Sequence, residues 1–222
     1  MKNLVIFDID GTLLHTADLH HRIIIALLQA DGMDPTFQPW AAYPHYTDLG
    51  VLQVVTRHYH GRDLTAAELA RSETLYAAAL AAHLQTADVP EVAGAARLIR
   101  DLRAMGVAVA FATGSLRDMA KIKLGLLGVD DDSTLATGGE FLTREEIVRD
   151  ATRRAVGVTP VNAVILGDGI WDQKTAANLA IPFVALETGT HQFDDQPALV
   201  IRDYTDLTAA DLVALARPVD WA

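Results

Sequence analysis

The sequence predicts an α/β protein in which a doubly wound parallel sheet carries a helical insertion near its start. Short apolar runs alternate with amphipathic helical patterns from about residue 90 onward, whereas only helical patterns occur between the first apolar run and residue 88. Alternating strands and helices are typical of a parallel sheet with helices on both faces. We therefore expect residues 1–14 and 89–222 to form the sheet domain and residues 15–88 a helical domain.

The expected strands are short continuous apolar runs, as in strands that are buried on both faces. The first run is Leu4–Phe7, and it stops abruptly at Asp8 and Asp10. In open α/β sheets ligands bind outside the carboxyl ends of the strands, so these two acids occupy a position suited to chemistry. Four further apolar runs begin at Val107, Asn162, Ile181 and Ala198.

The expected helices are recognised by apolar periodicity and by residues that favour helix ends. Helical patterns cover residues 17–32, 48–61, 65–84, 94–106, 115–128 and 143–157. Three pairs of residues have the spacing of a capping box at the start of a helix: Thr65 and Glu68, Ser115 and Asp118, and Thr143 and Glu146.

The composition excludes several classes of protein. Of the 222 residues, 50% are hydrophobic and 21% are charged, which describes a globular chain rather than a disordered one. A formal net charge of −11 argues against broad binding to nucleic acid or to an anionic membrane, since both need a cationic surface. The absence of cysteine excludes disulfides, a thiol nucleophile and a thiolate metal site. With neither a signal-peptide pattern nor a long apolar run, we expect a cytoplasmic protein that does not span a membrane.

Polar residues end three of the expected strands, and a parallel sheet brings such ends to one edge. Asp8, Thr113 and Asp168 are these residues, with Asp10 and Asp172 close by in sequence. Carboxylates gathered this closely repel one another unless a hard cation binds them or one keeps its proton, and Mg²⁺ prefers oxygen ligands. The hydroxyl and backbone N–H groups that follow the second strand are suited to an anion. The pattern indicates a Mg²⁺ site beside a phosphate site.

A bound phosphate also needs a cation. Arg144 falls in the first turn of an expected helix, where the helix dipole disfavours a positive side chain. This suggests that something other than helix stability keeps an arginine there. Lys121, Lys123 and Arg149 compete for the same role, and for each of them we expect a solvated helix face.

Four motifs in order resemble those of the haloacid dehalogenase superfamily. They are "DIDGT" at Asp8–Thr12, the strand that ends in Thr113-Gly114-Ser115, a basic residue opening a later helix, and "GDGIWD" at Gly167–Asp172. The helical insertion resembles the cap of the branch that contains phosphoglycolate phosphatases and β-phosphoglucomutases. The resemblance implies a Rossmann-like core with an inserted helical cap domain.

The resemblance also implies roles for individual residues. Asp8 would be the nucleophile that takes the phosphoryl group as an aspartyl phosphate, and Asp10 the acid that protonates the leaving oxygen and then activates water. Thr113, Gly114 and Arg144 would bind the phosphoryl oxygens. The third motif usually carries lysine, and here the best match is arginine.

In the same way, the resemblance implies a set of metal ligands. Asp8, the backbone carbonyl of Asp10, and Asp168 would hold Mg²⁺, with support from Asp172. The alternative for Asp172 is that it caps the helix that follows it, although we favour support of the metal site.

Several polar and aromatic residues of the insertion have a less specific interpretation. His15, His20 and His21 follow the first motif, and we expect them to be solvated rather than catalytic or metal-binding. Trp40, Tyr43 and Tyr46 either line a pocket or, as we expect, form part of the core of the cap.

The function predicted is that of a Mg²⁺-dependent phosphatase acting on a small phosphorylated metabolite. A sugar phosphomutase is the alternative, favoured by His20 at a position where β-phosphoglucomutase-like enzymes also have histidine, and disfavoured by the lack of lysine in the cap. An alternative of another class is a phosphoaspartate signalling module. The natural substrate and the oligomeric state, monomer or dimer, cannot be read from the sequence.

Overall fold

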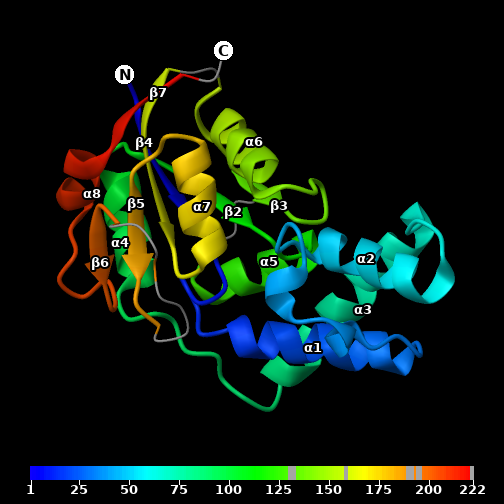
Figure 1. Cartoon of the computed structure of the whole chain (residues 1–222). Coiled ribbons are helices and arrows are strands. Elements are labelled where there is room, and N and C mark those ends of the chain that lie inside the picture. The colour runs from blue at the N-terminus through cyan, green and yellow to red at the C-terminus, as the bar shows by residue number, and fades with distance from the viewer. Residues whose placement is uncertain (130–133, 158–159, 189–192, 194–196, 221–222) are drawn as a thin grey trace.

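The core of the protein is a parallel sheet with one antiparallel strand added to it (Figure 1). The structure is a computed structural model that describes residues 1–129, 134–157, 160–188, 193 and 197–220. Strand order is β3-β2-β1-β4-β5-β6, and β7 pairs antiparallel with β4. The strands are β1 (Asn3–Phe7), β2 (Ala108–Thr113), β3 (Leu135–Thr137), β4 (Val161–Gly167), β5 (Phe183–Leu186), β6 (Leu199–Ile201) and β7 (Arg217–Val219).

The order in which strands are added to the sheet reverses between β1 and β4. The chain continues from β1 to β2 on one side, and β4, β5 and β6 add on the other side. Such a switch point opens a crevice at the carboxyl ends of the two central strands. The residues that follow β1 and β4 therefore lie where a ligand can be bound.

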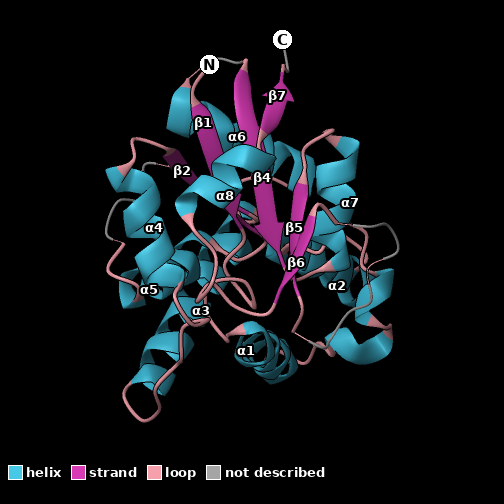
Figure 2. Ribbon diagram, turned by 90° about the vertical axis from the view of Figure 1, so that its left-hand side faces the viewer, coloured by secondary structure: helices cyan, strands magenta, loops and turns pink. Residues whose placement is uncertain are grey.

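Helices cover both faces of the sheet (Figure 2). Successive residues of β1 point to opposite faces, so Val5 and Phe7 belong to one hydrophobic cluster and Leu4 and Ile6 to another. The first cluster is completed by α4 (Ala95–Ala104) and α8 (Ala209–Leu215), and the second by α6 (Arg144–Val156) and α7 (Ile170–Asn178). The predicted fold class is confirmed.

The helical insertion follows β1 and lies beside the carboxyl ends of the strands (Figure 1). It has a hydrophobic cluster of its own, which extends onto Leu116 and Met119 of the sheet domain. The domain boundaries at residues 14 and 88 stay a prediction. The insertion contains α1 (Ala17–Ala30), α2 (Asp48–His60), α3 (Ala66–Leu84) and two short 3₁₀ helices, η1 (Pro35–Phe37) and η2 (Trp40–Ala42).

Two of the three predicted capping boxes are present, at Thr65 and at Thr143. The third prediction is wrong. Helix α5 (Arg117–Leu126) begins after Leu116, without a side-chain cap, and the Ser115 hydroxyl instead donates to Asp10. Sequence spacing identified a helix start there, but a buried carboxylate competes for the hydroxyl.

In the part of the chain that the structure describes, no helix has both the length and the apolar character needed to cross a membrane.

Candidate active site

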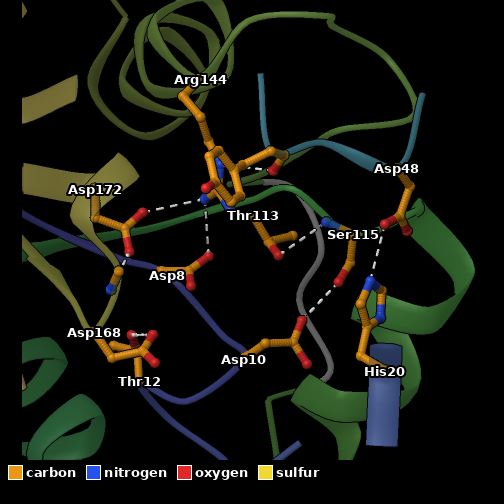
Figure 3. A network of polar contacts seen from close by, with 12 residues as sticks. Asp8, Asp10, Thr12, His20, Asp48, Thr113, Ser115, Arg144, Asp168 and Asp172 are labelled. Atoms are coloured by element: carbon orange, nitrogen blue, oxygen red, sulfur yellow. Dashed lines mark hydrogen bonds and ion pairs between the residues drawn. The ribbon is translucent and has the colours of Figure 1, made fainter. Parts of the chain in front are cut away.

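Two acidic side chains lie side by side at the carboxyl edge of the sheet (Figure 3). Asp8 follows β1 and Asp168 follows β4, and these strands are parallel neighbours. The backbone N–H of Asp8 donates to the Leu166 carbonyl oxygen of β4 at 3.0 Å, which holds the two strand ends together. Both side chains are buried. The convergence that we expected from the strand ends is present.

Asp172 joins these two residues to form what we call the three-carboxylate cluster. Asp8, Asp168 and Asp172 each offer one oxygen, and these oxygens lie within 4.8 Å of one another. Asp172 stands in the first turn of α7, where its carboxylate accepts the backbone N–H of Gly169 at 3.1 Å. A negative side chain is favourable at a helix N-terminus. Asp172 is thus at once a helix-capping residue and a member of an acidic group.

Arg144 is the cation of this cluster. Its Nη1 donates to an oxygen of Asp8 and to an oxygen of Asp172, each at 3.2 Å. Burial opposes the charge, but the carboxylates of Asp172 and Asp8 raise the pKa of Arg144. These contacts explain why an arginine occupies the first turn of α6 against the helix dipole.

One guanidinium does not compensate three carboxylates. Burial and the neighbouring Asp8 raise the pKa of Asp168 to about 7. For the same reasons the pKa of Asp172 lies well above its ordinary value. Burial also raises the pKa of Asp8, while Arg144 acts in the opposite direction. Without a further cation, therefore, ionisation of the whole cluster costs free energy.

The loop after Asp8 is built to approach this cluster closely. Gly11 has φ +79°, and a Cβ atom placed on it would lie 2.1 Å from an oxygen of Asp168. Only glycine fits, both for the space and for the left-handed backbone. The next residue, Thr12, donates its hydroxyl to Asp168 at 3.2 Å and so orients the carboxylate.

Asp10 points away from the three carboxylates into a second polar group, which we call the Asp10 cluster. Its carboxylate accepts hydrogen bonds from the Ser115 hydroxyl at 2.6 Å and the Thr16 hydroxyl at 2.5 Å. It also lies 2.6 Å from Lys123 Nζ. Burial alone would raise the pKa of Asp10, but Lys123 and His20 hold it well below its ordinary value.

The Asp10 cluster continues into the helical insertion through His20 and Asp48. Lys123 Nζ lies 3.1 Å from His20 Nδ1, and His20 Nε2 lies 2.9 Å from an oxygen of Asp48. The other oxygen of Asp48 accepts the backbone N–H of Leu116 at 2.8 Å. A chain of polar contacts therefore connects α1 and α2 of the insertion to α5 of the sheet domain.

Two predictions from the sequence are wrong at this point. Lys123 was expected on a solvated helix face, yet its side chain is completely buried. His20 was expected to be solvated, and it too is buried. A signal for Lys123 was present: it falls at helical spacing with the buried residues Met119, Ala120, Leu124 and Leu127, so it stands on the apolar face of α5.

Thr113 and Gly114 lie between the two clusters. Thr113 is buried, and its hydroxyl accepts the backbone N–H of Ser115 at 3.2 Å. A Cβ atom on Gly114 would lie 2.4 Å from the Tyr46 carbonyl oxygen and 2.8 Å from Arg144 Nη2. Gly114 is thus required where the insertion meets the sheet domain, whatever its part in binding an anion.

A cavity of about 360 Å³ opens onto both clusters. Its lining includes Asp8, Asp10, Thr113 and Arg144, together with residues of the insertion. The aromatic residues Trp40, Tyr43 and Tyr46 line it as well, and Tyr43 also belongs to the hydrophobic cluster of the insertion.

Solved structures of other proteins share this fold. CbbY from Rhodobacter sphaeroides in complex with phosphate has 21% identity and a TM-score of 0.73, over 96% of this chain and 99% of that chain. A CbbY variant has been solved with xylulose-(1,5)bisphosphate. A candidate β-phosphoglucomutase from Bacteroides vulgatus has 17% identity and a TM-score of 0.66, over 91% of this chain and 84% of that chain.

A candidate phosphoglycolate phosphatase from Lactobacillus plantarum has 18% identity and a TM-score of 0.61, over 97% of this chain and 100% of that chain. A comparison with curated protein sequences gave no match. The family model for haloacid dehalogenase-like hydrolases matches residues 2–179, which is most of the chain. The resemblance of the four motifs is confirmed, and the chain belongs to the haloacid dehalogenase-like hydrolase family.

Proposed function

We propose that the protein is a Mg²⁺-dependent phosphatase that hydrolyses a small phosphorylated metabolite through an aspartyl phosphate. The observation that carries this proposal is the contrast between two acids that are two residues apart. Asp8 belongs to a cluster with surplus negative charge, and Asp10 is held ionised beside a lysine. Environments that push the pKa values of two neighbouring carboxyl groups apart are typical of a pair with different catalytic roles.

The three-carboxylate cluster suits a hard divalent cation. Its ligand atoms are carboxylate oxygens, and the raised pKa of Asp168 indicates surplus negative charge that a cation would relieve. We assign Mg²⁺ to Asp8, Asp168 and Asp172, with the backbone carbonyl of Asp10 as a further ligand. The ion would supply positive charge that stabilises the transferring phosphoryl group.

Residues of the chain itself carry out the remaining catalytic steps. A carboxylate oxygen of Asp8 attacks phosphorus and the bond from phosphorus to the ester oxygen breaks. That oxygen takes a proton from Asp10, which receives it in turn from the ammonium group of Lys123 through their hydrogen bond. Water then attacks the phosphorus of the aspartyl phosphate and gives its proton to Asp10, which regenerates Asp8 and releases phosphate. Thr113, Gly114 and Arg144 hold the phosphoryl oxygens.

The test is release of inorganic phosphate from a panel of sugar phosphates, sugar bisphosphates, phosphoglycolate and nucleoside monophosphates, with and without Mg²⁺. We expect turnover that requires Mg²⁺ and that falls by at least about 10⁴-fold in Asp8→Asn. Asp101→Asn is the matched control, because Asp101 is an exposed carboxylate on α4 that forms an ion pair with Arg97. Activity that persists in Asp8→Asn would remove Asp8 from its role.

One observation favours the phosphomutase alternative. The lysine that the insertion lacks has a counterpart in Lys123, which contacts both Asp10 and His20 from the sheet domain. Formation of an isomerised sugar phosphate in place of free phosphate would favour a mutase. A long-lived phosphoaspartate without turnover would favour the signalling module. Cytoplasmic location stays a prediction of the sequence.

A further inference from the structure

Two chemically different groups of side chains line the cavity at the two clusters. Asp8 and Arg144, which contact each other, are the groups suited to a phosphoryl group. Four aromatic side chains, together with aliphatic ones, form the other group. The aromatic residues come from both parts of the protein: Trp40, Tyr43 and Tyr46 from the insertion, and Trp171 from α7 of the sheet domain.

The aromatic rings that line the cavity form two groups in which rings contact one another. Tyr46 stacks on Trp171 with ring centroids 4.4 Å apart, and Trp40 lies 5.2 Å from Tyr43. The ring of His21 also stacks on Trp40, with ring centroids 4.8 Å apart. The hydroxyl of Tyr43 donates to the Pro35 carbonyl oxygen at 2.7 Å, so its polar atom is already satisfied. Such a lining suits the apolar face of a ring.

The charges that line the cavity are mostly negative. Arg144 is the only arginine or lysine among the described residues that line it. Its guanidinium already donates to Asp8 and to Asp172. Burial and the nearby His20 lower the pKa of His21, which keeps that ring neutral. Five carboxylates line the cavity: Asp8, Asp10, Asp18, Asp48 and Asp168. A second anionic group on a substrate would meet carboxylates without a cation of its own.

Lys123 contacts Asp10 and His20 of the cavity lining, but it is completely buried and does not itself line the cavity. Other basic side chains lie in a separate groove. Lys174 and His45 line a neighbouring groove, and the stacked rings of Tyr46 and Trp171 line both the groove and the cavity. The aromatic stack therefore stands between the cavity and these two groups. A second phosphate held in the cavity does not reach them while the stack is in place.

We propose that the substrate is a monoester with a single phosphate, whose alcohol part is uncharged and carries a ring with an apolar face. This inference rests on the proposed phosphatase function and narrows its substrate class. The phosphate is placed at Asp8 and Arg144, and the ring lies against Trp40 and Tyr46. Exclusion of a second anion comes from the surplus of carboxylates in the cavity lining, which includes Asp18 of α1.

The test compares two substrates that differ by one charge far from phosphorus, benzyl phosphate and 4-carboxybenzyl phosphate. We expect kcat/KM for benzyl phosphate to exceed that for 4-carboxybenzyl phosphate by at least about tenfold, because the added carboxylate enters a cavity that is lined mostly by carboxylates. Asp8→Asn is measured on both substrates, so turnover by this site is recognised by its dependence on Asp8.

Two variants locate the selectivity. In Asp18→Lys we expect the ratio of the two kcat/KM values to fall by about tenfold, whereas Asp101→Lys, at an exposed position on α4, leaves the ratio unchanged. In Trp40→Ala we expect kcat/KM for benzyl phosphate to fall by about tenfold relative to methyl phosphate, because the ring loses its contact. Tyr59→Ala is the matched control: Tyr59 is an exposed aromatic residue of α2 that does not line the cavity.

The outcomes separate the two proposals. Turnover that depends on Asp8 but is equally fast for both benzyl substrates, or faster for the charged one, would overturn the substrate class and leave the phosphatase standing. The same holds if Asp18→Lys and Asp101→Lys change the ratio alike. Absence of phosphate release from every monoester, with and without Mg²⁺, would overturn the proposed function and this inference with it.

Discussion

The three-carboxylate cluster and the Asp10 cluster lie at one cavity, and they balance charge in opposite ways. In the first, three carboxylates share Arg144, and the pKa of Asp168 rises to about 7. In the second, Lys123 and His20 stand beside Asp10, whose pKa is lowered. The side chain of Asp10 is 14% exposed and those of Asp8 and Asp172 are 5% exposed, so all are largely shielded from solvent and the number of neighbouring cations makes the main difference. The comparison indicates which acids need an ion from solution and which do not.

The largest effect is expected from the cation of the Asp10 cluster. Lys123→Met leaves Asp10 buried without its lysine, which costs about 3–5 kcal/mol in the free energy of unfolding. Lys121→Met, at an exposed position on the same helix, is the control and is expected to change it by less than about 0.5 kcal/mol. Urea denaturation measures both. Equal effects of the two substitutions would mean that Lys123 does not balance a buried charge.

Removal of an acid from the three-carboxylate cluster should raise the free energy of unfolding rather than lower it. In metal-free protein at pH 8, Asp168→Asn removes a repelled charge, and its amide oxygen can still accept the Thr12 hydroxyl. We expect a gain of about 1–3 kcal/mol in the free energy of unfolding. Asp10→Asn, which leaves Lys123 buried without its carboxylate, should reduce that free energy. A change of the same sign in the free energy of unfolding for Asp168→Asn and Asp10→Asn would contradict the contrast between the two clusters.

A smaller effect is expected on the pH dependence of stability. Because the pKa of Asp168 is raised on folding, the folded protein binds more protons than the unfolded chain between about pH 4 and pH 7. The contribution of Asp168 to the free energy of unfolding is therefore most favourable at low pH, and it is lost as the pH rises through 7. Between pH 6 and pH 8, metal-free protein should lose about 1 kcal/mol that Asp168→Asn does not lose. Denaturation in the presence of a chelator measures this difference; identical pH profiles would contradict it.

The three-carboxylate cluster could be predicted because local pattern and topology agree. Asp8 and Asp168 each follow an apolar run, and parallel strands bring their ends to one edge. Asp172 follows four residues later, at the start of a helix that must return along the sheet. The sequence also identified Arg144 as misplaced for its helix, and the structure supplies the reason in its contacts with two carboxylates.

The Asp10 cluster could not be predicted in the same way, because its contacts join distant segments. Lys123 and Asp10 are 113 residues apart, and His20 and Lys123 are 103 apart. Neither pair is set by strand order. The first depends on how α5 lies against the loop after β1, and the second on how the insertion packs against α5. The apolar spacing around Lys123 indicates burial, but it does not name the partner. The short strands β3 and β7 were missed because Leu135–Thr137 and Arg217–Val219 do not form continuous apolar runs, whereas β6, of the same length, lies in the apolar run that begins at Ala198.

Calorimetric titration of Mg²⁺ at pH 8 into the protein, Asp168→Asn and Asp10→Asn tests the central claim most directly. The surplus charge of the three-carboxylate cluster predicts that the unaltered protein binds Mg²⁺, that Asp168→Asn loses at least about tenfold in affinity, and that Asp10→Asn keeps it, since its backbone carbonyl is unchanged. Equal affinity in Asp168→Asn and the unaltered protein, or loss confined to Asp10→Asn, would contradict the account.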